Sequence, residues 1–232
     1  KRKIMGKCLV IAGTGTDIGK TYVTGLIVKK LRDAGYNGGY YKAALSGAEP
    51  DETGALQPGD ALHVNQVAGI GETIPNLVSY IYREAVSPHL AAQINHNPID
   101  FDKIKRDFTR AKGKYELLTM EGSGGIICPL RWDKQQHVIL DDLVKELGLG
   151  VLVIADAGLG TINAVVLTIE HLQMQRIPVR GIIFNNYIPG DLMQDDNKKM
   201  IEAMTGIPVL AKVQHGDTEL SMDVKVLAGL YR

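Results

Sequence analysis

Cysteine is scarce in this 232-residue chain, which contains only Cys8 and Cys128. Two cysteines so far apart match neither a disulfide framework nor a zinc-ligand spacing, and the six histidines form no pair at such a spacing. We therefore expect a cytoplasmic protein with two reduced thiols, both packed as small core residues.

The chain also lacks an excess of charge of either sign. Its 26 Lys and Arg residues balance 26 Asp and Glu residues, which argues against a protein that coats nucleic acid. Long apolar runs are missing as well, because stretches such as residues 151–155 are far shorter than the ~20 residues that cross a bilayer. We expect no nucleic-acid partner, no membrane span and no signal peptide.

No internal repeat, low-complexity stretch or Pro/Ser-rich linker divides the chain. Residues 46–59 are rich in Gly, Pro and acidic side chains and are predicted to form a long loop, but the same sequence pattern resumes after them. We therefore expect one domain over residues 1–232, although the length also fits two small domains.

Apolar runs of strand length alternate with segments of helical period along the whole chain. Strands are predicted at residues 8–12, 39–43, 115–120, 151–155, 179–184 and 208–213. Helices are predicted around residues 23–31, 61–68, 161–175 and 193–204. Buried strands that alternate with helices usually form parallel sheets, so the pattern predicts an α/β fold with a mostly parallel sheet and helices on both faces.

Residues 13–21 have the sequence GTGTDIGKT and lie between a predicted strand and a predicted helix, where a phosphate-binding loop belongs. Gly19 lets the backbone approach a phosphate, Lys20 brings a charge to the outer phosphates, and the Thr21 hydroxyl can bind Mg²⁺. The strict Walker pattern has glycine at position 14, where this chain has Thr14, so the motif is a variant. A plain glycine turn is the alternative, but the GKT ending favours nucleotide binding and a P-loop NTPase-like fold.

Three further candidates follow neighbouring strands, because ligands of open α/β sheets bind at the carboxyl ends of the strands. Lys42 ends one predicted strand, Ser46 lies just beyond it, and Glu121 follows another strand and opens the segment EGSGG. The alternatives are a solvated lysine at Lys42 and an exposed carboxylate in a glycine turn at Glu121.

Asp60 precedes the predicted helix 61–68, where it fits a helix N-cap better than a metal ligand when it is considered alone. Together with Glu121 and Thr21 it would supply the hard oxygen atoms that Mg²⁺ prefers. Lys20 and Lys42 would neutralise a transferring phosphoryl group. This set describes a phosphoryl-transfer site without an obvious protein nucleophile.

Six segments, taken in order, resemble dethiobiotin synthetase. They are GTGTDIGKT, YYKAALSG, SPHL at residues 87–90, EGSGG, GTIN at residues 160–163 and FNN at residues 184–186. The resemblance implies an ATP-dependent carbon–nitrogen ligase, a cyclo-ligase, that converts 7,8-diaminopelargonate, CO₂ and MgATP to dethiobiotin, ADP and phosphate in biotin synthesis. It also explains the missing nucleophile, because one substrate amine takes up CO₂ and the other closes the ring on the phosphorylated carbamate.

The same resemblance implies roles for individual residues. Lys20 and Lys42 are the expected catalytic residues, which stabilise carbamate and phosphoryl oxygens. Residues expected to contact ATP, the last two at adenine, are Asp17, Ile18, Gly19, Lys20, Thr21, Tyr22, Glu121, Gly122, Ser123, Gly124, Asn185 and Asn186. The expected Mg²⁺ ligands are Thr21, Asp60 and Glu121.

The diamine substrate is expected to contact Ser46 and, across the interface of a homodimer, a helix start that receives its carboxylate. That helix start comprises Gly160, Thr161, Ile162 and Asn163. Without the resemblance, it is an ordinary helix start with Thr161 as its cap. The chain departs from the family at residues 212–216, KVQHG, where the family often has a proline-containing turn beside adenine.

A partition- or Min-type switch ATPase is the main rival interpretation. Such proteins share the variant loop, but they carry a signature lysine near its start, where this chain has Thr14 and Gly15. A non-enzymatic nucleotide-binding subunit is a further alternative, because a fold by itself does not determine a function.

Overall fold

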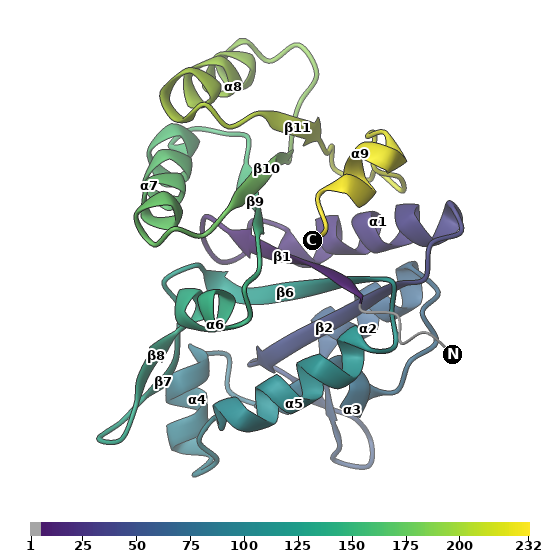
Figure 1. Ribbon diagram of the computed structural model, residues 1–232, viewed down its shortest axis with the longest axis vertical. Coiled ribbons are helices and arrows are strands. Elements are labelled where there is room, and N and C mark those ends of the chain that lie inside the picture. The colour runs from purple at the N-terminus through teal and green to yellow at the C-terminus, as the bar shows by residue number, and fades with distance from the viewer. Residues whose placement is uncertain (1–5) are drawn as a thin grey trace.

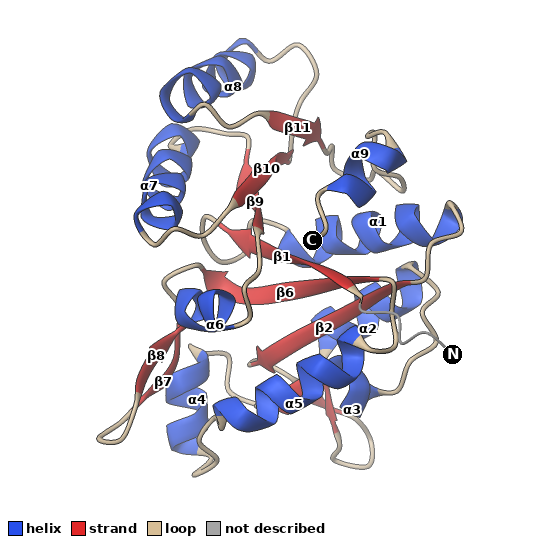
Figure 2. Ribbon diagram, in the orientation of Figure 1, coloured by secondary structure: helices blue, strands red, loops and turns tan. Residues whose placement is uncertain are grey.

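The computed structural model describes residues 6–232, which form a central sheet between layers of helices (Figures 1 and 2). The strands are β1 (Lys7–Gly13), β2 (Gly38–Leu45), β3 (Glu49–Pro50), β4 (Leu56–Gln57), β5 (Val78–Ile81), β6 (Leu117–Gly125), β7 (Pro129–Trp132), β8 (His137–Ile139), β9 (Val151–Asp156), β10 (Val179–Asn185) and β11 (Val209–Lys212). The helices are α1 (Lys20–Asp33), α2 (Gly59–Val67), α3 (Ile74–Leu77), α4 (Pro88–Ile94), α5 (Phe101–Lys112), α6 (Leu140–Glu146), α7 (Thr161–Met174), α8 (Leu192–Thr205) and α9 (Val224–Gly229).

Seven strands form the main sheet in the order β11-β10-β9-β1-β6-β2-β5, with parallel pairing throughout. The predicted parallel α/β fold is confirmed, and all six predicted strands are present within a few residues of their expected bounds. The predicted loop at residues 46–59 contains the small antiparallel hairpin β3–β4, which the composition of this segment did not indicate.

Helices cover both faces of the sheet, as predicted. On β1, Leu9 and Ile11 pack in the cluster that includes residues of α1 and α9, whereas Val10 and Ala12 pack in the cluster that includes residues of α5, α6 and α7. This alternation follows from the two-residue period of a strand that is buried on both faces. Figure 2 shows α7 and α8 on one side of the sheet and α1 and α9 on the other.

The two cysteines differ in their surroundings. Cys8 lies in the sheet core as expected, whereas Cys128 is half-buried: it packs against the core cluster and also lines a cavity. Within residues 6–232, no helix combines the length and the apolar character that crossing a membrane requires.

The topology brings the predicted site residues to one edge of the sheet. β1 leads into the phosphate-binding loop, its neighbour β6 carries Glu121, and β2 beyond it carries Lys42. Lys42 and Glu121 are direct partners in the β2–β6 register, so their side chains leave the sheet on the same face. Glu121 lies within β6 rather than after it, because pairing with β1 extends this strand to Gly125.

Candidate active site

The phosphate-binding loop joins β1 to α1 and ends at Gly19, which has a φ of 86°. A side chain at this position would place its Cβ only 2.0 Å from the Asn185 amide nitrogen, so both the conformation and the space require glycine. No side chain of the described residues caps the start of α1, and its first N–H groups are therefore available to an anion. The Lys20 ammonium folds back onto the Gly15 carbonyl, 2.7 Å away.

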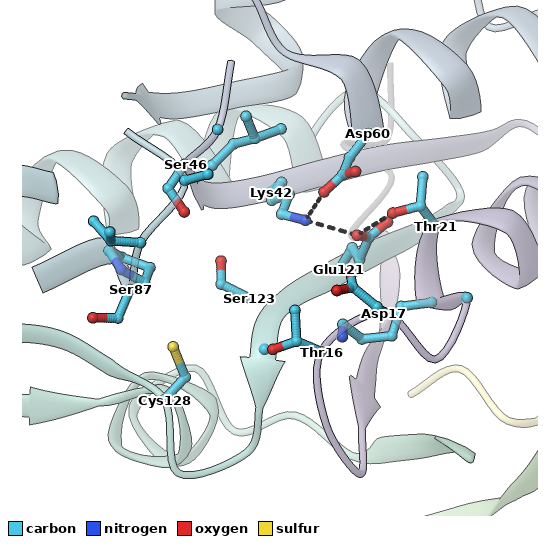
Figure 3. Close-up of a pocket in the computed structure, with 18 of the residues that line it drawn as sticks. Thr16, Asp17, Thr21, Lys42, Ser46, Asp60, Ser87, Glu121, Ser123 and Cys128 are labelled. Carbon is cyan, nitrogen blue, oxygen red and sulfur yellow. Dashed lines mark hydrogen bonds and ion pairs between the residues drawn. The ribbon is translucent and has the colours of Figure 1, made fainter. Parts of the chain in front are cut away.

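Lys42 lies at the centre of a buried charge cluster (Figure 3). Its Nζ is 2.5 Å from Asp60 Oδ2 and 2.7 Å from Glu121 Oε1. The Thr21 hydroxyl donates to the same Glu121 oxygen at 2.9 Å, and the Tyr40 hydroxyl donates to Oε2 at 3.3 Å. Lys42 and Glu121 are only 4% and 1% exposed, so each charge depends on its partners for compensation.

The charges in this cluster shift one another's pKa values. Burial acts to lower the pKa of Lys42, but the carboxylates of Glu121 and Asp60 outweigh it, and the net shift is upward. Burial acts to raise the pKa of Asp60, but the Lys42 charge outweighs it, and the net shift is downward. The pKa of Lys20 is lowered by burial and by the positive charge of Lys42. Lys42 and Asp60 therefore remain ionised around neutral pH.

Asp60 is not the N-cap of α2, so that interpretation of the sequence is wrong. The N-cap residue is Pro58, and Asp60 lies in the first turn of the helix. From this position its carboxylate reaches Lys42, 18 residues earlier in the chain. Because α2 packs against β2, the Asp60 side chain is part of the charge cluster.

The oxygen atoms of Thr21, Asp60 and Glu121 line one cavity and fit a magnesium ion by their chemistry, because Mg²⁺ prefers hard oxygen ligands. Within the part of the chain that the structure describes, no three His, Cys, Asp or Glu side chains form a metal cluster. A cation here would complete its coordination with water and phosphate oxygens, as Mg²⁺ commonly does.

The cavity has a volume of about 910 Å³ and two unlike ends. One end holds the charge cluster and the phosphate-binding loop, and the other carries uncharged polar side chains (Figure 3). The uncharged end is lined by Ser46, Ser87, Ser123 and Cys128. The sequence analysis assigned site roles to Ser46 and Ser123, placed Cys128 in the core, and gave no role to Ser87, although it lies in the SPHL segment.

Most of the predicted site residues line this cavity. They are Asp17, Gly19, Lys20, Thr21, Tyr22, Lys42, Ser46, Asp60, Glu121, Ser123 and Gly124. Two of their neighbours in the chain, Ile18 and Gly122, are not among the residues that line the cavity. Ile18 offers its carbonyl to Asn185, and Gly122 packs against Leu140, where a Cβ would come within 2.7 Å of that side chain.

The remaining predicted residues lie on the β9–β10 side of the loop. Asn185 is 4% exposed and donates from Nδ2 to the Ile18 carbonyl at 2.9 Å, so it holds the backbone of the phosphate-binding loop in place. Asn186 bonds to Asp156 at 2.7 Å. At the start of α7, the N-cap is Gly160 rather than Thr161, whose hydroxyl is buried and has no partner among the described residues. Ile162 and Asn163 follow in the first turn of this helix.

Known proteins similar to this chain fall into two groups. A family model described as an AAA domain matches residues 7–218. An ATP-dependent dethiobiotin synthetase BioD of Brachyspira hyodysenteriae is 48% identical over 227 residues, which cover 98% of this chain and 100% of that protein. A protein of the same name from Clostridium botulinum (strain Loch Maree / Type A3) is 49% identical over 205 residues, covering 88% of this chain and 89% of that protein.

Solved structures resemble the chain at much lower identity. A MinC:MinD cell division protein complex from Aquifex aeolicus gives a TM-score of 0.56 at 14% identity, covering 97% of this chain and 86% of that one. A ParA family ATPase from Chlorobium tepidum gives a TM-score of 0.51 at 13% identity, covering 91% and 84%. At such identities the likeness extends to the fold alone.

Proposed function

This chain belongs to the ATP-dependent dethiobiotin synthetase family, and we propose that it converts 7,8-diaminopelargonate, CO₂ and ATP to dethiobiotin, ADP and phosphate by closing a ureido ring. The chain is thus an ATP-dependent ligase of biotin biosynthesis. We propose in addition that it is a cyclo-ligase, which closes a ring within its substrate. One observation carries it: Lys42, Glu121 and Asp60 meet beside the phosphate-binding loop in a single cavity.

The reaction needs positioning and charge neutralisation more than a protein nucleophile. One substrate amine forms a C–N bond to CO₂, and a carbamate oxygen then attacks the γ-phosphorus while ADP leaves. The second amine attacks the carbamate carbon, the ring closes, and phosphate leaves with the carbamate oxygen. Each step places negative charge on oxygen, which Lys20 and Lys42 can stabilise from fixed positions.

Cys128 lines the cavity, but its thiol is not an ionised nucleophile that would compete with the substrate amine. Burial raises the pKa of the Cys128 thiol to about 11, against the smaller opposing effects of Lys20 and Lys42. The thiol therefore stays protonated at neutral pH and does not compete for the phosphorylated carbamate. The hydroxyl groups of Ser46 and Ser87 at the same end can hydrogen-bond neutral amines.

Thr21, Asp60 and Glu121 are the proposed ligands of Mg²⁺, which would offset phosphate charge when bound. Lys42 keeps the Asp60 carboxylate ionised and oriented toward the cavity. The Thr21 hydroxyl and Lys42 both contact Glu121 Oε1, so these two contacts fix the orientation of that carboxylate.

The remaining assignments are proposals from the family resemblance. Residues 17–22 and 121–124 would line the phosphates, and Asn185 and Asn186 would meet the adenine. Ser46 would contact the diamine, with residues 160–163 of a second copy receiving its carboxylate in a homodimer. A single domain and a cytoplasmic location also remain predictions.

Phosphate release from MgATP with bicarbonate, measured with and without 7,8-diaminopelargonate, tests the proposal when dethiobiotin is followed by mass. We expect release that depends on the diamine and equals the dethiobiotin formed. Diamine-independent hydrolysis without product would instead favour the switch ATPase, which only the distant fold likeness supports.

A further inference from the structure

Two consecutive residues in the first turn of α1 reach opposite sides of the phosphate-binding loop. The Thr21 hydroxyl points to Glu121 on β6, 2.9 Å away. The Tyr22 hydroxyl donates instead to the backbone carbonyl of Asp217, in the segment that follows β11. The first turn of α1 therefore contacts both the charge cluster and the segment that follows β11.

Residues 214–217 form a closed turn, which we call the β11 turn. The Asp217 carboxylate accepts from the Gln214 N–H at 2.8 Å, and the Asp217 N–H donates to the Gln214 carbonyl at 3.3 Å. Just before the turn, Val213 is held to the end of β10 by backbone bonds to Phe184 and Tyr187 of 2.7 and 2.9 Å. The turn thus has one fixed base on β10 and one tie to α1 through Tyr22.

The sheet order indicates which part of ATP lies near the β11 turn. The loop follows β1, and the groups suited to the γ-phosphate lie on β6 and β2, on one side of it. A triphosphate that spans the loop therefore directs its nucleoside toward the other side. That side consists of the carboxyl ends of β9, β10 and β11, where the β11 turn lies.

We propose that Tyr22 is a positioning residue that holds the β11 turn against the nucleoside of bound ATP and so sets the affinity for the base. The inference rests on the proposed function only in that ATP occupies the phosphate-binding loop. The Tyr22 ring is half-buried and packs against the cluster that includes residues of α1 and α9, so this packing aims the hydroxyl. Removing the hydroxyl alone would release the turn and leave the ring in place.

The test compares the affinity for MgATP with that for magnesium tripolyphosphate, which lacks the nucleoside, by calorimetry on the whole chain. For Tyr22→Phe we expect the Kd of ATP to rise about 3- to 10-fold, the range for one lost hydrogen bond. The Kd of tripolyphosphate should stay within about twofold, because its contacts are confined to the loop. In turnover, the KM for ATP should rise while kcat changes little.

Tyr36→Phe is the matched control. Tyr36 is also half-buried against the same cluster, and its hydroxyl has no hydrogen-bond partner among the described residues. This variant should leave both affinities unchanged. A Tyr22→Phe variant that weakens ATP and tripolyphosphate equally, or weakens neither, overturns the proposal.

A second variant removes a different hydrogen bond of the β11 turn, the one between the Asp217 side chain and Gln214. Asp217→Ala removes the side-chain bond to the Gln214 N–H and leaves the turn held only by the longer backbone bond, so it should also raise the Kd of ATP while sparing tripolyphosphate. If both side chains act through the turn, the double variant should be no weaker than the worse single variant. Fully additive effects would overturn the proposal. Because binding is measured directly, a chain that binds ATP but makes no dethiobiotin would count against the proposed function alone.

Discussion

The two sides of the phosphate-binding loop differ in how complete they are within one chain. On the β6–β2 side, Lys42, Glu121 and Asp60 are buried or half-buried and bonded to one another. On the β9–β10–β11 side, large apolar side chains are exposed to solvent: Leu159 is 91% exposed and Leu192 is 84% exposed. The groups proposed for phosphoryl transfer are therefore preorganised, whereas the opposite side presents surface of the kind that partners cover.

This contrast separates two kinds of function. A charge cluster that must stabilise a transition state gains from being fixed before the substrate arrives. A surface that receives a second copy or a substrate terminus has to stay open until then. In the homodimer proposed from the resemblance, residues 160–163 on the open side of one copy would reach the diamine at the β6–β2 side of the other copy.

Lys42→Ala would break the preorganised side and should have the largest effect. Turnover should fall by about 10³-fold or more, because the variant loses a fixed charge at the reacting oxygens and leaves Glu121 buried without its ammonium partner. Much of the MgATP binding should survive, since the loop itself is intact. Turnover and calorimetric binding are the two measurements.

Lys29→Ala is the control for this variant. Lys29 pairs with Asp33 on the outer surface of α1 at 2.7 Å, so its loss removes a lysine without touching the cavity. Near-normal turnover in Lys42→Ala would remove Lys42 from the mechanism, and a thermal unfolding scan would show whether a lost activity reflects lost folding.

Glu121→Gln would remove one negative charge from the same side and keep the shape of the side chain. We expect the Mg²⁺ concentration for half-maximal activity to rise by about 10- to 100-fold, as for other residues that orient or bind a metal. Glu146→Gln, on an exposed part of α6, should leave it unchanged. An unaltered Mg²⁺ requirement in Glu121→Gln would contradict its role as a ligand.

Mixing two defective variants tests whether the open side of one subunit completes the site of the other. Asn163→Ala should raise the KM for the diamine about tenfold if its amide meets the substrate carboxylate. Mixed with Lys42→Ala at low diamine concentration, it should restore about a quarter of the wild-type activity, because half the dimers then contain one intact site. Activity no greater than that of the separate variants would contradict a site shared between subunits.

Glu72→Gln concerns the opposite, amino-terminal edge of the sheet and should have the smallest effect. Hydrogen bonds from Lys114, from the Thr73 N–H and from Asn76 lower the pKa of Glu72 from 4.5 to about 2. Since the folded-state pKa is depressed, the stabilisation is present above pH 4.5 and is lost as the pH falls toward 2.

The two proteins should therefore differ in their free energy of unfolding by about 1 kcal/mol or less at neutral pH, and the difference should vanish near pH 2. Denaturant unfolding across this pH range measures it. Turnover should not change, because Glu72 lies outside the cavity. A loss of turnover at neutral pH would show that the two edges of the sheet are not independent.

The parts of the fold that the sequence predicts are those with a local pattern. Residues 151–155 form an apolar run that is buried on both faces, and such runs identify the central strands. The GKT ending locates the phosphate-binding loop, and the end-of-strand positions of Lys42 and Glu121 suggest their roles. β5 escapes prediction because its sequence, VSYI, is too short to show a period.

The contacts within the site are less predictable, because they join distant segments. Asp60 looks like an N-cap in its local sequence, and only the packing of α2 reveals its bond to Lys42. Asn185 follows an ordinary buried strand, and its position under Gly19 depends on the order of the strands in the sheet. Cys128 resembles a core residue until the loop after β6 turns it into the cavity.

The long sequence separations within the site also have a consequence for synthesis of the chain on the ribosome. Lys42 and Glu121 are 79 residues apart, Ile18 and Asn185 are 167 apart, and Tyr22 and Asp217 are 195 apart. Loops of such length are closed only when most of the sheet has formed. The GKT segment therefore leaves the ribosome early without its supporting partners, and the nascent chain acquires its full affinity for ATP only after β10 and the β11 turn have emerged.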